Sequence, residues 1–107
     1  MNSKSPRFRA SYDFNLADAR AFQRICRNLQ ARHGAVPPAL IEAAGDYVNA
    51  GSRLAQMQIV LTAVTRRAQG PAAESARVLQ INRQIDATTS LRLRLADRLG
   101  LLDEVPV

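Results

Sequence analysis

Residues 40–64 read LIEAAGDYVNAGSRLAQMQIVLTAV, and this stretch decides the fold. Apolar side chains recur in it every seventh residue, and a second apolar series follows the first three places later. This spacing is typical of a helix that packs against another helix along one seam. The two series are Leu40, Tyr47, Leu54 and Leu61, and Ala43, Ala50, Met57 and Val64. We therefore predict a long helix from Pro38 to about Arg67.

The partner of this helix follows it in the sequence. Gly70 and Pro71 are typical of a helix end and of the first turn of the next helix. That next helix is predicted to continue to about Leu99, with an apolar seam that only Arg92 interrupts. Because the connection is short and the two helices are similar in length, we predict an antiparallel helical hairpin over residues 37–100.

Several apolar residues lie off the seam of this hairpin. Ile59 on the first helix, and Leu91 and Leu93 on the second, would remain partly exposed if the two helices packed only against each other. Such stripes indicate a further packing surface, most simply another subunit. The predicted oligomer interface consists of Leu40, Tyr47, Leu54, Leu61, Ile59, Leu91 and Leu93.

A shorter amphipathic helix is predicted at residues 15–34, after an arm at residues 1–14 that serine and proline keep irregular. Asn15 is a favourable N-cap, and Gly34 suits a helix end. At about 100° per residue, Arg20, Arg24 and Arg27 gather on one face. The opposite face is apolar and consists of Phe22, Ile25, Cys26 and Leu29.

The positive charge is concentrated in the first third of the chain. The net charge is +6, and residues 1–34 contribute +5 of it, from seven Lys and Arg against two acids. A basic segment joined to a nearly neutral one is typical of a protein with a part that binds a polyanion. The predicted DNA-binding residues are Lys4, Arg7, Arg9, Arg20, Arg24, Arg27 and Arg32.

This DNA contact is predicted to be made with phosphates and not with bases. The second helix begins with apolar and acidic residues, whereas the recognition helix of a helix-turn-helix carries its base-reading side chains at that end. Arginines on the first helix and on the arm suit sequence-independent phosphate contact instead.

The residue pattern gives no indication of an enzyme. The sequence has no Gly-rich phosphate loop, and its one cysteine and one histidine are too few for a zinc site. We expect no catalytic residue, no cofactor and no metal, and we expect Cys26 to pack as a small apolar residue. No apolar run is long enough to span a bilayer, and the N-terminus lacks the apolar stretch of a signal peptide. These features favour a cytoplasmic protein.

Residues 95–106 read LADRLGLLDEVP, so a Leu-Gly-Leu stands at the end of the second predicted helix of the hairpin, and the tail follows it. Over residues 37–107 the chain resembles the small subunit of phage terminases, and most of all the shortened form in gene transfer agents. The resemblance implies an all-α protein that forms a ring through its hairpin and acts in a bacterial cell. It also implies that the ring binds double-stranded DNA and delivers it to the large terminase subunit, the packaging motor.

The tail, residues 101–107, is predicted to contact that large subunit. Its apolar anchors would be Leu101, Leu102 and Val105. Two other interpretations stay open, namely a frayed helix end and a clip between subunits. For the whole chain, one alternative is a small basic dimeric protein that organises DNA or regulates genes. Another is a helical adaptor whose arginines meet an acidic protein.

Overall fold

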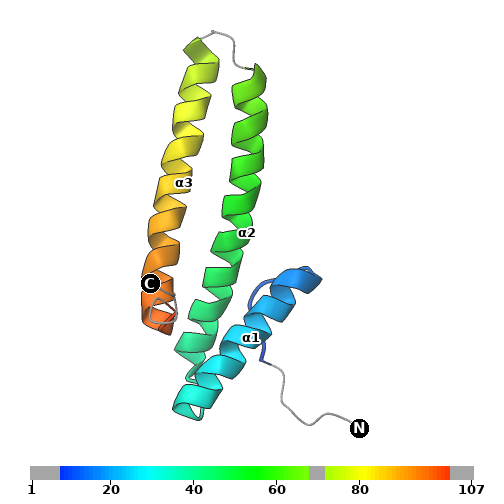
Figure 1. The fold of residues 1–107 in the computed structure, drawn as a ribbon, viewed down its shortest axis with the longest axis vertical. Helices are drawn as coiled ribbons and strands as arrows, with labels where there is room; N and C mark the ends of the chain where they lie inside the picture. The colour runs from blue at the N-terminus through cyan, green and yellow to red at the C-terminus, as the bar shows by residue number, and fades with distance from the viewer. Residues whose placement is uncertain (1–7, 68–71, 102–107) are drawn as a thin grey trace.

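The computed structural model describes residues 8–67 and 72–101, and within them it contains three helices and no strand. The helices are α1 (Leu16–His33), α2 (Pro38–Arg67) and α3 (Ala72–Leu99). Figure 1 shows α2 and α3 side by side and running in opposite directions, with α1 lying across the lower half of α2. The molecule is elongated, with extents of 58 × 31 × 25 Å. The predicted all-helical class is confirmed.

Local sequence signals set the ends of α1. The Asn15 side chain accepts a hydrogen bond of 2.8 Å from the Asp18 backbone N–H, which satisfies one of the free donors at a helix start. At the other end Gly34 adopts a φ of 80° and donates its N–H to the Gln30 carbonyl. A residue with a Cβ is strained at such a φ, so glycine suits this position. Both predicted ends are confirmed.

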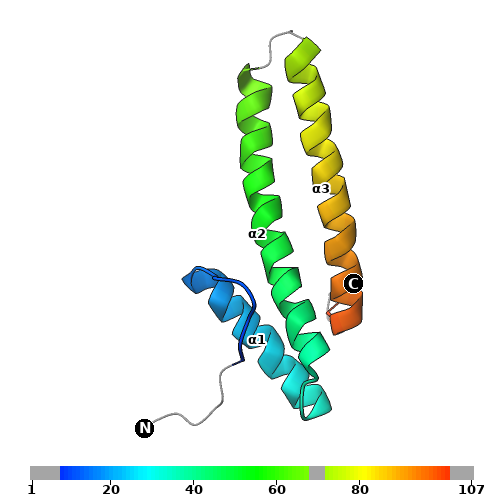
Figure 2. The same cartoon turned by 180° about the vertical axis from the view of Figure 1, so that it is seen from behind.

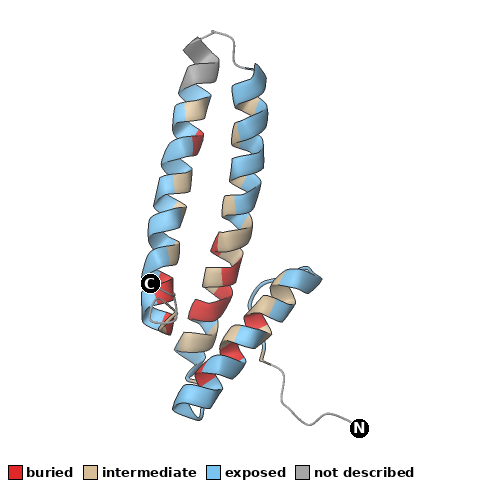
Figure 3. Cartoon of the chain, in the orientation of Figure 1, coloured by how far each residue is buried: buried red, intermediate tan, exposed pale blue. Residues whose placement is uncertain are grey.

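The hydrophobic core is located where all three helices meet (Figure 3). Small residues of α2, including Ala43 and Ala44, allow α1 to approach closely. The core consists of Phe22, Cys26, Leu29, Ala43, Ala44, Val48, Leu95 and Leu99. Towards the Arg67 end of the hairpin, Ile81 is the one buried residue of α3 between residues 76 and 94. The described chain therefore has a three-helix base and a thin two-helix extension.

Arg92, the residue that interrupts the apolar seam of α3, crosses the surface of α2. Its guanidinium carbon lies 4.1 Å from the centre of the Tyr47 ring, a cation–π arrangement. A Cβ on Gly51 would come within 3.0 Å of the guanidinium, so the bare backbone of Gly51 leaves the space that Arg92 occupies. The Nε atom of Arg92 is buried without a hydrogen-bond partner.

Arg32 ties the end of α1 to the end of α3. Its Nη2 donates to the Leu99 carbonyl at 3.1 Å, and its Nη1 donates to the Gly100 carbonyl at 3.5 Å. Carbonyls at the C-terminal end of a helix lack partners within the helix and carry partial negative charge, so a guanidinium satisfies both needs. Gly100 has a φ of 75°, and the Leu101 N–H donates to the Ala96 carbonyl at 2.8 Å.

We expect Gly100→Ala to lower the free energy of unfolding by about 1–2 kcal/mol, because an alanine at this positive φ is strained. Its Cβ would also lie 2.9 Å from Arg32 Nη1 and displace the guanidinium. Chemical denaturation followed by circular dichroism measures the change. Gly45→Ala is the matched control, since its Cβ would meet the Tyr12 ring at an ordinary 3.5 Å. That variant should equal or exceed the wild type because alanine favours a helix. Equal losses in both variants would contradict this explanation.

Candidate nucleic-acid interface

The outer face of α1 carries three exposed arginines, Arg20, Arg24 and Arg27. They line one surface depression together with Leu16 and Gln23. The face of α1 opposite to them is fixed in the core, where Phe22, for example, is 1% exposed. Among the described residues, no acidic side chain pairs with these arginines. Their guanidinium groups are therefore presented together on a helix that cannot turn them inward.

The arm next to this face is anchored by aromatic rings. The Tyr12 and Phe14 rings stack at 5.4 Å, and Phe14 in turn lies 5.9 Å from Phe22 of the core. The Tyr12 hydroxyl donates to Asp46 Oδ1 of α2 at 2.5 Å. This hydrogen bond, assisted by partial burial, raises the pKa of Tyr12 above its ordinary value. Residues 8–14 therefore lie against α1 and α2 although they form no regular element. Figure 2 shows the dark-blue segment crossing α1.

Gln23 joins the arm to the arginine face. Its Nε2 donates to the Phe8 carbonyl at 2.7 Å, and its Oε1 accepts from the Phe8 N–H at 3.2 Å. A side-chain amide that pairs with both polar groups of one backbone residue fixes the position and the direction of that residue. Phe8 is followed by Arg9, which is exposed. This pair of hydrogen bonds, the Gln23 clamp, thus holds the backbone residue before Arg9 against a side chain that lines the depression of Arg20, Arg24 and Arg27.

Because of this clamp, we expect Gln23→Met to weaken DNA binding about three- to tenfold while leaving the helical content unchanged. Methionine has a similar length and no charge, but it can form neither hydrogen bond to Phe8. Fluorescence anisotropy with a labelled duplex measures the effect. Gln30→Met is the control, since Gln30 is exposed on the same helix and its side chain forms no hydrogen bond with the described residues. A Gln23→Met variant that matches this control would show that the clamp does not contribute to binding.

The other predicted DNA-binding residues are placed differently. Arg9 is exposed, whereas Arg32 donates to the end of α3 and is a structural tie in this chain. Lys4 and Arg7 lie outside the described residues. The described part of the predicted interface is therefore Arg9 with the three arginines of α1.

The predicted oligomer residues divide into two groups. Leu40 and Tyr47 pack against the chain's own core, and Leu54 and Leu61 are half-buried. The other three predicted residues are exposed: Ile59 is 69%, Leu93 55% and Leu91 42% exposed. The second group is the apolar surface that remains available to another chain.

The predicted docking anchors of the tail are only partly described. Leu101 is half-buried and packs against the core, so its side chain is already used within the chain. Leu102 and Val105 lie outside the described residues. Leu101 is therefore a poor candidate for contact with a separate protein.

Cys26 is buried in the core, whereas His33 lies on the surface. Burial of the Cys26 thiol raises its pKa to about 11, so the thiol is protonated at neutral pH and packs as a small apolar group. His33 is exposed in the last turn of α1. The described residues contain no cluster of three His, Cys, Asp or Glu that could hold a metal ion. Within the same ranges, no helix combines the length and the apolar character that crossing a membrane requires.

Comparisons of this chain with protein-family models, with curated proteins and with solved structures gave no match.

Proposed function

We propose that this protein is a small terminase subunit that binds DNA with low sequence specificity and delivers it to a large terminase motor. The observation that carries the proposal is the arginine face of α1, which is exposed, pairs with no acid of the described residues and lies opposite a face fixed in the core. Neither enzymatic activity nor a cofactor is part of this function. Its setting is the cytoplasm of a bacterial cell, where DNA is packaged into phage-like particles.

Phosphate contact is the mode of DNA binding that suits this surface. Guanidinium groups bind phosphate oxygens through paired hydrogen bonds, and such contacts set affinity and register without reading sequence. The four guanidinium groups in the described part of the interface give only modest affinity on one copy. Several copies on one duplex raise the avidity without any new contact, provided that the copies are linked.

Self-association is therefore the second part of the proposal. Ile59 and Leu93 are more than half exposed on helices whose other faces pack within the chain. Burying such side chains against another copy would stabilise an oligomer by removing apolar surface from water. We propose a ring, in which each copy turns its α1 arginines toward the same duplex.

Native mass spectrometry combined with a pull-down tests this function. The chain has a mass of 11.7 kDa, and we expect a single closed assembly of many copies that retains duplex DNA and co-purifies with a large terminase subunit. A discrete dimer that protects defined operator sequences would instead support the DNA-organising or regulatory alternative. Binding to an acidic protein that excess DNA does not displace would support the adaptor alternative.

A further inference from the structure

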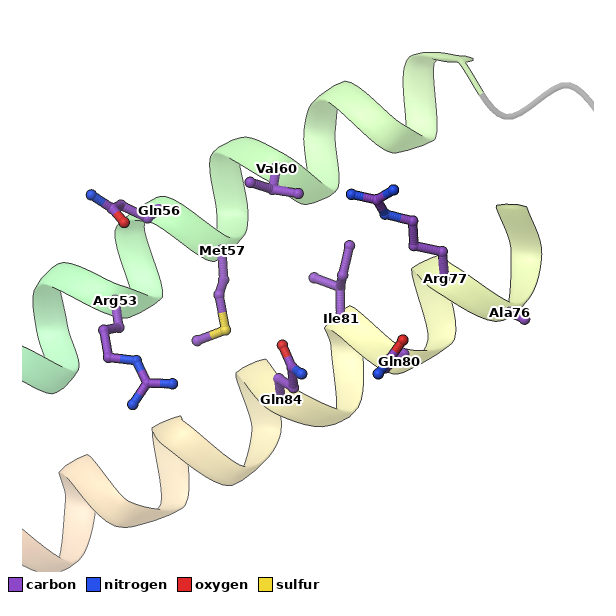
Figure 4. Close-up of a pocket in the computed structure, with 9 residues that line it drawn as sticks. All are labelled: Arg53, Gln56, Met57, Val60, Ala76, Arg77, Gln80, Ile81 and Gln84. Carbon is purple, nitrogen blue, oxygen red and sulfur yellow. The ribbon is translucent and has the colours of Figure 1, made fainter. Parts of the chain in front are cut away.

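A groove lies between α2 and α3 in the thin half of the hairpin, away from α1. Its volume is about 700 Å³ (Figure 4). Met57, Val60 and Ile81 form an apolar floor, and Figure 4 shows Met57 and Ile81 pointing into the space between the helices. Arg53 and Arg77 stand at opposite ends of the groove. An apolar floor between two cations suits a peptide that carries both apolar and acidic side chains.

The spacing of the two arginines narrows the choice of peptide. Arg53 extends from α2 toward α3, and Arg77 extends from α3 toward Val60 of α2 (Figure 4). Arg53 and Val60 are seven residues apart, which is about 10 Å along a helix. Neighbouring residues of an extended chain point to opposite sides. Two adjacent acids could therefore reach the two guanidinium groups at once. Arg53 and Arg77 are both exposed, and neither pairs with an acid of the described chain.

The chain itself contains a segment of this chemistry. Asp103 and Glu104 are the only two adjacent acids in the sequence, and apolar residues lie on both sides of them, in Leu102 and Val105. No other Asp or Glu is directly followed or preceded by an acid in the sequence. The segment thus carries two adjacent negative charges with one apolar side chain before them and one after them, which matches the apolar floor and the two cations of the groove.

The reach of the chain identifies which copy supplies the segment. Arg77 is 22 residues before Leu99, about 33 Å along α3. Glu104 is five residues beyond Leu99, so its backbone can extend at most about 18 Å from that point. The remaining distance of about 15 Å exceeds what the side chains of Arg77 and Glu104 span together, so the acids of one chain cannot reach both arginines of its own groove. We infer that the groove of each copy binds residues 102–107 of a second copy.

This contact joins two different surfaces, a groove on one copy and a tail on the next. Such head-to-tail contacts build rings when the rotation closes and filaments when it does not. The inference rests on the self-association in the proposed function and is independent of DNA binding. It gives the tail a partner other than the large subunit, which agrees with the use of Leu101 in the chain's own core.

Charge reversal with rescue tests the inference. We expect Asp103→Arg/Glu104→Arg, and separately Arg53→Glu/Arg77→Glu, to reduce the native mass from the assembly to the monomer. Because opposite charges then face each other again, combining the four substitutions should restore the assembly. The matched controls are Asp86→Arg/Asp97→Arg and Arg83→Glu/Arg94→Glu, which reverse exposed charges of α3 outside the groove. Both controls should keep the wild-type mass.

The outcomes separate this inference from the proposed function. Wild-type mass in both reversed variants, or a monomeric wild type, would overturn the inference. Failure of the four-fold variant to reassemble would also contradict it, provided that circular dichroism shows the variant to be folded. A labelled peptide of residues 102–107 should bind the full-length Asp103→Arg/Glu104→Arg variant, whose groove is intact, and a peptide with both acids changed to Ser should not. A wild type that assembles but binds no DNA would instead refute only the proposed function.

Discussion

Replacement of Arg20, Arg24 and Arg27 by glutamate is expected to lower the affinity for duplex DNA about a hundredfold or more near 0.15 M salt. Each phosphate contact contributes about 0.9 to the slope of log affinity against log salt. Loss of three contacts therefore lowers that slope by about 3, and at this salt it corresponds to roughly two orders of magnitude in affinity. Anisotropy titrations at several salt concentrations measure both quantities.

A matched triple variant separates this site from general charge. Arg66, Arg83 and Arg94 are exposed residues of α2 and α3, and changing them to glutamate alters the net charge by the same amount. We expect that variant to lose much less affinity and to keep a slope closer to that of the wild type. Equal losses in the two triple variants would show that the arginines of α1 form no specific interface. Both variants should retain the helical content of the wild type, since all six positions are exposed.

The second large effect is a loss of folding free energy on truncation of Phe22. Phe22→Ala should lower the free energy of unfolding by about 3–5 kcal/mol, because it leaves a cavity at the meeting point of the three helices. Phe22 is 1% exposed, and its ring lies next to that of Phe14. For a domain of this size each kcal/mol corresponds to about 4–8 °C, so the midpoint of thermal unfolding should fall by at least about 12 °C.

Leu16→Ala provides the control on the same helix. Leu16 is 67% exposed, so its truncation should change the free energy of unfolding by less than about 0.5 kcal/mol. Both variants must be compared at one protein concentration, since association links stability to concentration. A Phe22→Ala protein that unfolds within 2 °C of the wild type would show that α1 is not held in the core as described.

Local signals in the sequence were sufficient to place the ends of α1. Asn15 and Gly34 act through their immediate backbone, so their roles can be read from neighbouring residues. The seven-residue apolar period likewise predicted a long helix, because packing requires a repeating stripe. These elements follow from the chemistry of short segments.

The hydrogen bonds between segments that are distant in the sequence could not be predicted in this way. Arg32 lies 67 residues before Leu99, and no pattern in the sequence links the two. The same holds for Tyr12 with Asp46, which lie 34 residues apart, and for the clamp of Gln23 on Phe8. The charge of Arg32 and its place on the basic helix predict a phosphate ligand. Charge alone does not reveal that the Leu99 carbonyl of another helix is its partner.

The apolar residues off the seam show the same limit. Ile41 and Val48 lie off the seven-residue seam of α2, as Ile59 does, yet the first two pack in the core whereas Ile59 remains 69% exposed. Helix α1 has only 18 residues against 30 in α2, so it covers one part of α2 and leaves the other bare. The sequence shows that the stripe is apolar, but the crossing of α1 determines which part is covered.

The most direct test of DNA binding by phosphate contact is a titration of the wild-type protein with two duplexes. The duplexes have the same length and unrelated sequences, and each is titrated at four salt concentrations between 50 and 300 mM. We expect the two dissociation constants to agree within about threefold and to rise steeply with salt. A preference of a hundredfold or more for one duplex, or an affinity that does not change with salt, would contradict phosphate binding by the arginine face of α1.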